Sequence, residues 1–343
     1  MEREKVILPK FDVQQYLKEG QMVYAKRAEL EKIADKISVE GYSNIFLLGI
    51  GGTRAEFAPV TYIMEKYSDV DVYLVNAAEI NVLKPRKLNK NSIVITASAS
   101  GNTKEIVDSV KWIVDKGSRV IAFTKLDSEI GKIAQQVIEA KITTGGCEFS
   151  YLLFDLFALR LLYDRGDFPK YKKFADQMEG IFDNLVSIRE QFDPKAEEIA
   201  KKYYNEPYNI WVGSGALWGE TYLFSMCILE EMQWVRTKSV KSSEFFHGTL
   251  ELVDRDVPVF LLKGEDESRA LDTRVEKFAR KVTDKLVVFD TAEYALDGID
   301  SEFRMIVSPL IATSILTERL ASYYETYTKH NLNYRRYYRQ FDY

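Results

Sequence analysis

The segment Asn44-Ile-Phe-Leu-Leu-Gly-Ile-Gly-Gly52 is an apolar run that ends in a glycine-rich turn. A run of this length, bounded by turn residues, is typical of a buried β-strand. The segment Ile210-Trp-Val-Gly-Ser-Gly215 opens in the same way, about 165 residues further along the chain. Two such openings predict a duplicated architecture, in which each half begins with a strand and a glycine turn.

Strands and helices are expected to alternate after each opening. Expected strands are 44–48, 70–75, 92–96, 119–124, 208–213, 257–262 and 285–289. Expected helices are 13–39, 55–66, 103–115, 217–234 and 267–280. Strand, turn, helix and strand in succession indicate parallel sheets covered by helices. We therefore predict an α/β fold of two α/β/α sandwich halves with parallel sheets, joined by helices.

The composition suggests five segments in the 343 residues. They are an N-terminal helical segment (1–40), a first half (41–147), a helical linker (148–204), a second half (205–292), and a C-terminal helix with an aromatic and basic tail (293–343). Seven tyrosines and three arginines lie in 322–343, so we expect this tail to pack on the body or on a partner chain. A single-stranded nucleic-acid platform also mixes aromatic residues with arginine.

Charge and composition exclude several classes of protein. The net charge of −5, with lysine and arginine scattered among acidic residues, argues against nucleic-acid binding. Two cysteines and two histidines do not make a disulfide framework or a Cys/His zinc site. The most apolar window, 149–163, is interrupted by Asp155 and Arg160 and predicts a buried helix, not a membrane span. The charged N-terminus is no secretory signal, so we expect a cytoplasmic protein.

The turn Ser98-Ala-Ser-Gly-Asn-Thr103 lies between an expected strand and an expected helix. Ser98, Ser100 and Thr103 offer hydroxyl groups, and the helix start offers free N–H groups and a positive dipole end. Such a turn suits a phosphate monoester. A helix N-cap is the alternative, but a cap needs one hydroxyl and this turn has three.

The first glycine turn, Gly49-Ile-Gly-Gly52-Thr53, is a weaker candidate. It lacks the third glycine of the dinucleotide-binding pattern, and no lysine follows in the spacing of a nucleotide-hydrolysing loop. A tight strand-to-helix turn explains it as well as a ligand contact does. Gly52 and Thr53 are its candidate binding residues, and Ser214 is their counterpart in the second half.

Glu231 and His247 are the candidates for proton transfer. A carboxylate and an imidazole are the side chains that most often move protons at neutral pH. His247 is one of only two histidines and lies 16 residues after Glu231. Each residue alone has an ordinary structural explanation, a solvent-facing carboxylate and a buried imidazole.

These motifs resemble the sugar isomerase (SIS) superfamily. Ser98-x-Ser-Gly-x-Thr103 matches its phosphate loop, and the spacing from Glu231 to His247 is similar to that in the isomerase half of glucosamine-6-phosphate synthase. The fructosamine-6-phosphate deglycases match more specifically, in segments 227–234, 244–248, 251–253, 267–269 and in His330-x-x-x-x-Arg-Arg-Tyr337. Thr249, Arg236 and Ala99 depart from the usual deglycase residues.

The resemblance implies cleavage of fructosamine 6-phosphates by water to glucose 6-phosphate and a free amine. Glu231 would move hydrogen between C1 and C2, and His247 would handle oxygen protons from the neighbouring subunit of a homodimer or higher oligomer. Ser98, Ser100 and Thr103 would hold the phosphate, with no metal or organic cofactor. Alternatives are an aldose–ketose phosphosugar isomerase, an aminosugar-phosphate deaminase, or a sugar-phosphate sensor. The sequence does not identify the amine.

Overall fold

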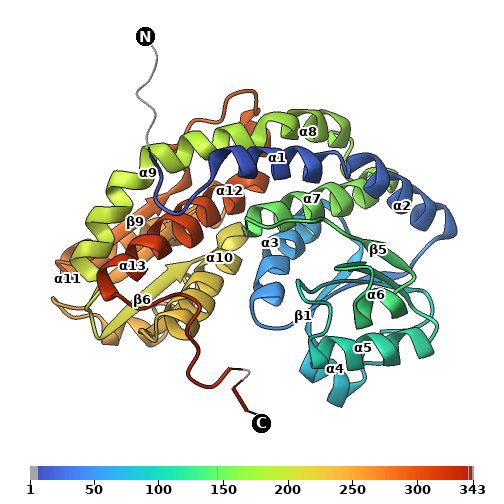
Figure 1. The fold of residues 1–343 in the computed structure, drawn as a ribbon, viewed down its shortest axis with the longest axis horizontal. Coiled ribbons are helices and arrows are strands. Elements are labelled where there is room, and N and C mark those ends of the chain that lie inside the picture. Colours follow the sequence, from blue (N-terminus) through green and yellow to red (C-terminus); the bar gives the residue numbers. More distant parts are fainter. Residues whose placement is uncertain (1–6, 145, 339, 342–343) are drawn as a thin grey trace. The chain divides into compact units, whose positions relative to one another are not determined.

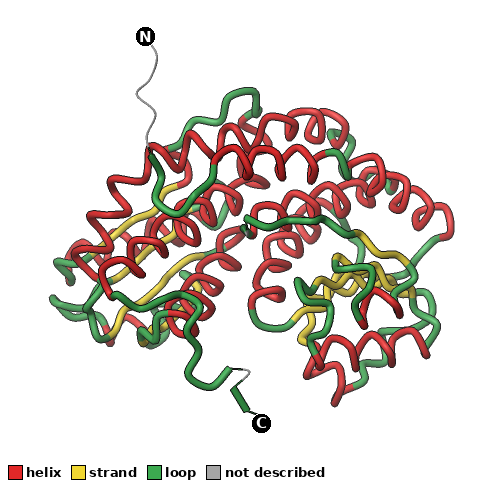
Figure 2. Tube along the Cα trace, in the orientation of Figure 1, coloured by secondary structure: helices red, strands yellow, loops and turns green. Residues whose placement is uncertain are grey.

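The computed structural model describes residues 7–144, 146–338 and 340–341. Its contacts divide the chain into two compact units. The N-terminal unit comprises 18–145 and 149–179, and the C-terminal unit comprises 1–17, 146–148 and 180–343. Figure 1 labels many of the elements, and Figure 2 colours helices and strands differently. Residues 1–6, Arg339 and Tyr343, which belong to the predicted end segments, lie outside the described residues.

The N-terminal unit contains a five-stranded parallel sheet in the order β2-β1-β3-β4-β5. Its strands are β1 (Asn44–Gly49), β2 (Asp71–Asn76), β3 (Ser92–Ala97), β4 (Arg119–Phe123) and β5 (Gln136–Ile138). The helices in this part of the chain are α1 (Val13–Tyr24), α2 (Arg27–Glu40), α3 (Gly52–Tyr67), α4 (Ala77–Leu83), α5 (Lys104–Asp115), α6 (Glu129–Ile133), α7 (Cys147–Asp164) and α8 (Tyr171–Gln177).

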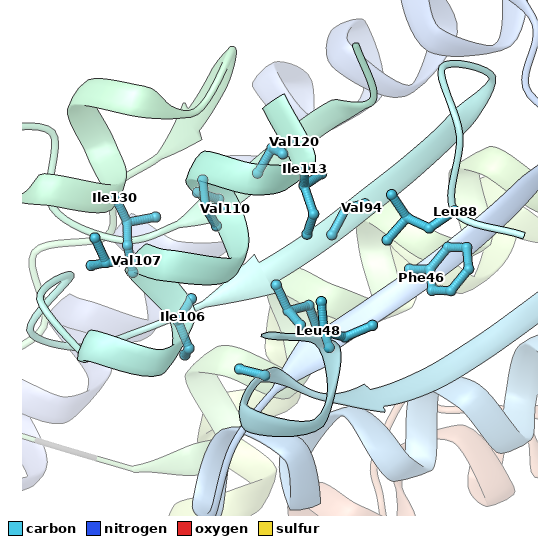
Figure 3. Packing of buried hydrophobic residues seen from close by; sticks show 13 residues of the cluster. Phe46, Leu48, Leu88, Val94, Ile106, Val107, Val110, Ile113, Val120 and Ile130 are labelled. Carbon is cyan, nitrogen blue, oxygen red and sulfur yellow. The ribbon is translucent and has the colours of Figure 1, made fainter. Parts of the chain in front are cut away.

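Apolar side chains cover both faces of this sheet, because successive residues of a strand point to opposite sides. On one face Phe46, Leu48 and Val94 pack against Val110 and Ile113 of α5 (Figure 3). On the other face Phe57 of α3, Phe123 of β4 and Phe154 of α7 pack ring against ring. A sheet buried on both faces explains why its strands read as continuous apolar runs.

The C-terminal unit contains a four-stranded parallel sheet in the order β7-β6-β8-β9. Its strands are β6 (Tyr208–Gly213), β7 (Arg236–Lys241), β8 (Val259–Lys263) and β9 (Leu286–Asp290). The helices are α9 (Ile181–Tyr203), α10 (Trp218–Leu223), α11 (Arg269–Val282), α12 (Arg304–Thr313) and α13 (Ala321–Thr328), with π-helices η3 (Phe224–Met232) and η7 (Ser314–Leu320). Short 3-10 turns are Met178–Gly180, Gly215–Leu217, Thr249–Leu252, Thr291–Glu293 and Ser301–Phe303.

A buried tryptophan organises the core of the C-terminal unit. The Trp211 ring stacks on Phe260, with ring centroids 4.5 Å apart, and on Phe289 at 6.0 Å. Its indole N–H donates to Asn209 Oδ1 over 2.7 Å, so the polar atom of this buried ring has a partner. The opposite face of the sheet packs Ile210 and Val212 against α11 and Phe245.

The predicted fold class is confirmed: both units are α/β structures with parallel sheets. The two sheets also share a strand order. In each unit the first strand lies between the second and the third, as β2-β1-β3 and as β7-β6-β8. The expected helix 13–39 is wrong as one element, because the chain forms α1 and α2 on either side of residues 25–26. The expected helix 217–234 begins as α10 and continues as the π-helix η3. In the described part of the chain, no helix has the length and apolarity that crossing a lipid bilayer requires.

Candidate active site

The hydroxyl-rich turn 98–103 joins the end of β3 to the start of α5. The hydroxyl groups of Ser98 and Thr103 are 3.1 Å apart, and the N–H of Gly101 donates to Ser98 Oγ over 3.0 Å. The N–H of Asn102 donates to the hydroxyl of Ser100. The structure therefore gathers the predicted hydroxyl groups into one small loop at the carboxyl end of a parallel strand, where α/β folds bind ligands.

Thr103 occupies the N-cap position of α5 without capping the helix. Its side chain forms no hydrogen bond to the amides of the first turn. Its Oγ1 lies against Ser98 Oγ instead. The alternative explanation of this turn, a simple helix cap, thus does not describe its geometry. An uncapped helix start presents N–H groups and a positive dipole end that favour an anion.

Gly101 is required by the shape of this loop. Its φ of +67° lies in the left-handed region that side chains disfavour. A Cβ atom added here would approach Ser128 Oγ to 2.0 Å and Thr124 Oγ1 to 2.6 Å. Thr124 and Ser128 lie in the turn that follows β4. The loop 98–103 therefore packs against the turn after the neighbouring strand.

The first glycine turn lies beside the hydroxyl-rich loop, because β1 and β3 are paired neighbours with Leu48 opposite Thr96. Gly52 and Thr53 form the first turn of α3, and both are half-buried. A Cβ atom on Gly49 would approach the backbone nitrogen of Arg54 to 2.7 Å, so the chain needs glycine to turn here. The structure thus brings Thr53 and the 98–103 loop to one edge of the sheet; their roles as ligand contacts stay predictions.

Ser214 lies in a buried polar cluster of the C-terminal unit. Its hydroxyl is 2.6 Å from Asp272 Oδ1 and 2.8 Å from Ser268 Oγ. Ser242 also donates to Asp272 Oδ1, at 2.6 Å. Burial raises the pKa of Asp272, and the two serine hydrogen bonds act in the opposite direction. The predicted sugar contact of Ser214 stays a prediction, with its hydroxyl already engaged inside the unit.

The loop after β3 in the N-terminal unit and the loop after β8 in the C-terminal unit carry different polar groups. The loop after β8 is the counterpart of the loop after β3, and it carries Asp266. The Asp266 carboxylate accepts the N–H of Ala216 over 3.1 Å and the N–H of Ser268 over 2.7 Å. A built-in carboxylate thus binds amides at this position, whereas the loop of the N-terminal unit offers hydroxyl groups and an uncapped helix.

Glu231 lies near the end of the π-helix η3, which is a wider helix often found at functional sites. Its Oε1 accepts a hydrogen bond from Nε of Arg335 over 2.8 Å, and its side chain is 30% exposed. Trp234, three residues on, adopts φ of +56°, an uncommon conformation for a side chain of this size. The chain reverses there and enters β7.

A cavity of about 520 Å³ opens beside Glu231. Its lining combines two carboxylates, three guanidinium groups and three aromatic rings with two smaller side chains. The residues are Glu230, Glu231, Trp234, Val235, Arg236, Thr237, Arg335, Arg336, Tyr337 and Tyr338. The volume lies in the range of small-molecule sites. Glu231 therefore faces a space large enough for part of a substrate.

His247 lies at the other end of β7 from Glu231. The helix α10–η3 runs antiparallel beside this strand: Thr237 bonds Glu230 over 2.6 Å, and Lys241 approaches the Trp218 ring to 5.7 Å. β7 alone spans roughly 17 Å at the usual rise per residue. His247 is exposed on the turn that follows the strand. One chain therefore does not bring its own Glu231 and His247 together.

The sequence interpretation missed Arg335 and Arg336 as site residues. Their motif, His330-x-x-x-x-Arg-Arg-Tyr337, was visible, but its contact with Glu231 joins residues 104 apart. His330 packs against Trp234 with ring centroids 4.3 Å apart, which holds the tail segment beside the end of η3. Within residues 7–144, 146–338 and 340–341, no three His, Cys, Asp or Glu side chains are grouped as metal ligands would be.

Comparison with known proteins shows that the chain is similar to two named deglycases. Fructosamine deglycase FrlB of Bacillus subtilis is 29% identical over 318 residues, which cover 90% of this chain and 95% of the relative. Fructoselysine 6-phosphate deglycase of Escherichia coli is 26% identical over 89% of this chain and 88% of its own.

A solved structure is similar to this chain over nearly its whole length. The crystal structure described as a phosphosugar isomerase of Bacillus subtilis superposes with a TM-score of 0.86 at 28% identity, covering 94% of this chain and 99% of that one. No protein-family model matches the sequence. The predicted resemblance to the sugar isomerase superfamily, and within it to the fructosamine-6-phosphate deglycases, is confirmed.

Proposed function

We propose that this chain is a deglycase that cleaves fructosamine 6-phosphates with water, giving glucose 6-phosphate and a free amino acid. The observation that carries the proposal is the uncapped start of α5 with its three hydroxyl groups, in a chain similar to deglycases over nine tenths of its length. Ser98, Ser100 and Thr103 bind the phosphate. Gly52, Thr53 and Ser214 are the further candidates for contacts with the sugar.

The chemistry needs one base that serves two adjacent carbons. The substrate carries a ketone at C2 and a secondary amine on C1. Removal of a proton from C1 gives an enolamine, and protonation at C2 then gives an imine between C1 and nitrogen. Water adds to C1 and the amine leaves. Glu231 carries the proton between C1 and C2, a role that contributes about 10²–10⁴-fold in rate.

His247 acts in the site of a second subunit. The chain's own Glu231 lies at the far end of β7, so the imidazole that joins a given Glu231 comes from a neighbouring copy in a homodimer or higher oligomer. There it moves protons to and from the sugar oxygens during ring opening and enolisation. Binding of the phosphate fixes the remote end of the substrate, which lowers the entropy cost of orienting C1 for proton transfer. Phosphorylated sugars are retained in the cytoplasm by their charge, and this is the expected location.

The test is turnover of 6-phosphofructosyl amino acids by the wild-type protein and by Glu231→Gln. Glucose 6-phosphate is measured with a coupled dehydrogenase, and the amine is identified by mass. Wild-type protein is expected to release both products in equal amounts, and the variant is expected to lose at least about a hundredfold in kcat. Full activity of the variant would remove Glu231 from the mechanism. Interconversion of sugar phosphates without amine release would identify an isomerase instead.

A further inference from the structure

We propose that the cavity beside Glu231 binds the α-carboxylate of the substrate's amino-acid part, through the guanidinium groups of Arg236 and Arg336. This inference rests on the deglycase function proposed above and deepens it. Arg236 and Arg336 would select substrates whose amine carries a carboxylate close to the nitrogen.

The lining of the cavity carries more positive than negative charge, with three guanidinium groups and two carboxylates. The carboxylate of Glu231 is paired with Arg335, and that of Glu230 accepts a hydrogen bond from Thr237 over 2.6 Å. Within the described residues, neither Arg236 nor Arg336 forms an ion pair. The cavity therefore presents an uncompensated positive charge, which favours an anionic ligand group.

Arg336 contacts an aromatic ring, and its N–H groups have no partner among the described residues. Its guanidinium carbon lies 4.3 Å from the centroid of the Trp234 ring. A cation–π contact uses the face of the guanidinium group, whereas carboxylates bind to the N–H groups in its plane. The Trp234 ring also packs against the ring of His330, which fixes its position. The tail thus supplies a cation whose position is set before the substrate arrives.

Bond lengths place an α-carboxylate in this cavity. In an α-linked fructosyl amino acid the carboxyl carbon is three bonds from C1, or about 4 Å. Because Glu231 must reach C1, the carboxylate has to lie in the space that Glu231 lines. In an ε-linked fructosyl lysine four more bonds intervene, which moves the carboxylate about 5 Å further away. Trp234 and Tyr337 leave aromatic surface for the amino-acid side chain.

The experiment compares 6-phosphofructosyl-glycine with 6-phosphofructosyl-glycinamide, in which a neutral amide replaces the carboxylate. Wild-type protein is expected to prefer the glycine compound by about ten- to a hundredfold in kcat/KM, as for hydrogen bonds to charged groups. Arg336→Gln and Arg236→Gln are expected to lower this ratio, mainly through KM, and the double variant to abolish it. Arg255→Gln, an exposed arginine paired with Asp284, is the matched control and is expected to keep the wild-type ratio.

The outcomes separate the two proposals. Equal turnover of both substrates by the wild-type protein, or an unchanged ratio in the double variant, would overturn the carboxylate site and leave the deglycase function intact. Absence of amine release from either substrate by the wild-type protein would overturn the deglycase function and this inference with it. Thermal unfolding of each variant checks that the exposed arginines are not needed for folding.

Discussion

Arg335 donates a hydrogen bond from Nε to the carboxylate of Glu231 over 2.8 Å, joining the C-terminal tail to the end of the π-helix η3. Its Nη1 group also donates to the carbonyl oxygens of Leu332 and Tyr334, at 2.7 and 2.9 Å. The guanidinium group is thus fixed by its own tail segment before it meets the carboxylate. The tail segment thus lines the cavity of the candidate active site.

Replacing Arg335 with glutamine is expected to lower kcat by about ten- to a hundredfold, because a charge-assisted hydrogen bond that orients Glu231 is lost. Arg335→Lys keeps the charge without the planar donor group and is expected to recover only part of the activity. A lower kcat with unchanged KM and unchanged thermal unfolding would distinguish a positioning role from a purely structural one. A wild-type kcat in Arg335→Gln would show that the contact has no role in catalysis.

A shared active site predicts complementation between inactive variants. Glu231→Gln and His247→Gln are each expected to be inactive alone. In a mixed dimer, one of the two sites combines an intact Glu231 from one chain with an intact His247 from the other. Random reassortment of equal amounts is expected to restore about a quarter of the wild-type activity. Mixed dimers that form, as judged by differently tagged chains, and yet stay inactive would contradict the shared site.

Gly101→Ala is expected to damage the phosphate loop specifically. The added methyl group would overlap Ser128 Oγ, and φ of +67° would be strained. We expect a stability loss of about 1–3 kcal/mol and a rise in KM for phosphorylated substrates. Gly166→Ala is the control, since its φ of +85° brings the same kind of strain and nothing lies within 4 Å of the new Cβ. Equal KM values in the two variants would show that the loop does not bind the phosphate.

The parts of the fold that sequence predicted are those decided by local pattern. β1, β3 and β6 are buried on both faces, so their apolar runs and following glycines were sufficient to place them. The loop 98–103 was predictable for the same reason, because its hydroxyl groups and its helix are adjacent along the chain. Nothing in these segments required knowledge of a distant residue.

The parts that escaped prediction depend on tertiary contacts. β7 reads Arg-Thr-Lys-Ser-Val-Lys and is an edge strand, so it lacks the apolar run that marks a central strand. The apolar pattern of 217–234 is compatible with an α-helix and with a π-helix, so it does not predict the change from α10 to η3. The contact of Arg335 with Glu231 depends on how the tail returns to the unit. Their residue types were recognisable, but not their proximity.

Arg189 on α9 is predicted to be essential for the stability of the C-terminal unit. It is fully buried, donates to the carboxylate of buried Glu148, and also donates to the hydroxyl of Tyr16 over 3.1 Å. Arg189→Met would leave the Glu148 carboxylate buried without its cation, which costs about 3–5 kcal/mol. Replacing Glu148 and Arg189 together by methionine is expected to recover much of that loss. Urea unfolding measures both, with exposed Lys201→Met on the same helix as the control.

Glu318 on the π-helix η7 predicts a pH dependence of stability. Burial raises its pKa from 4.5 to about 7, and nearby Glu148 adds to the increase, while Arg189 and Arg319 oppose it. At pH 4 and below, the carboxyl is protonated in both the folded and the unfolded chain and has no effect. Between about pH 4.5 and 7 the unfolded chain loses this proton while the folded chain keeps it, so the free energy of unfolding falls as pH rises.

Above pH 7 the full cost is reached, about 3 kcal/mol at 1.36 kcal/mol for each unit of pKa difference. Glu318→Gln has no proton to lose there, so it is expected to be more stable than the wild type at pH 8 and close to it at pH 4.5. Urea unfolding at the two pH values measures the difference, and Glu198→Gln, an exposed glutamate on α9, is the control. A stability difference between Glu318→Gln and wild type that stays constant with pH would show that the carboxyl does not titrate in this range.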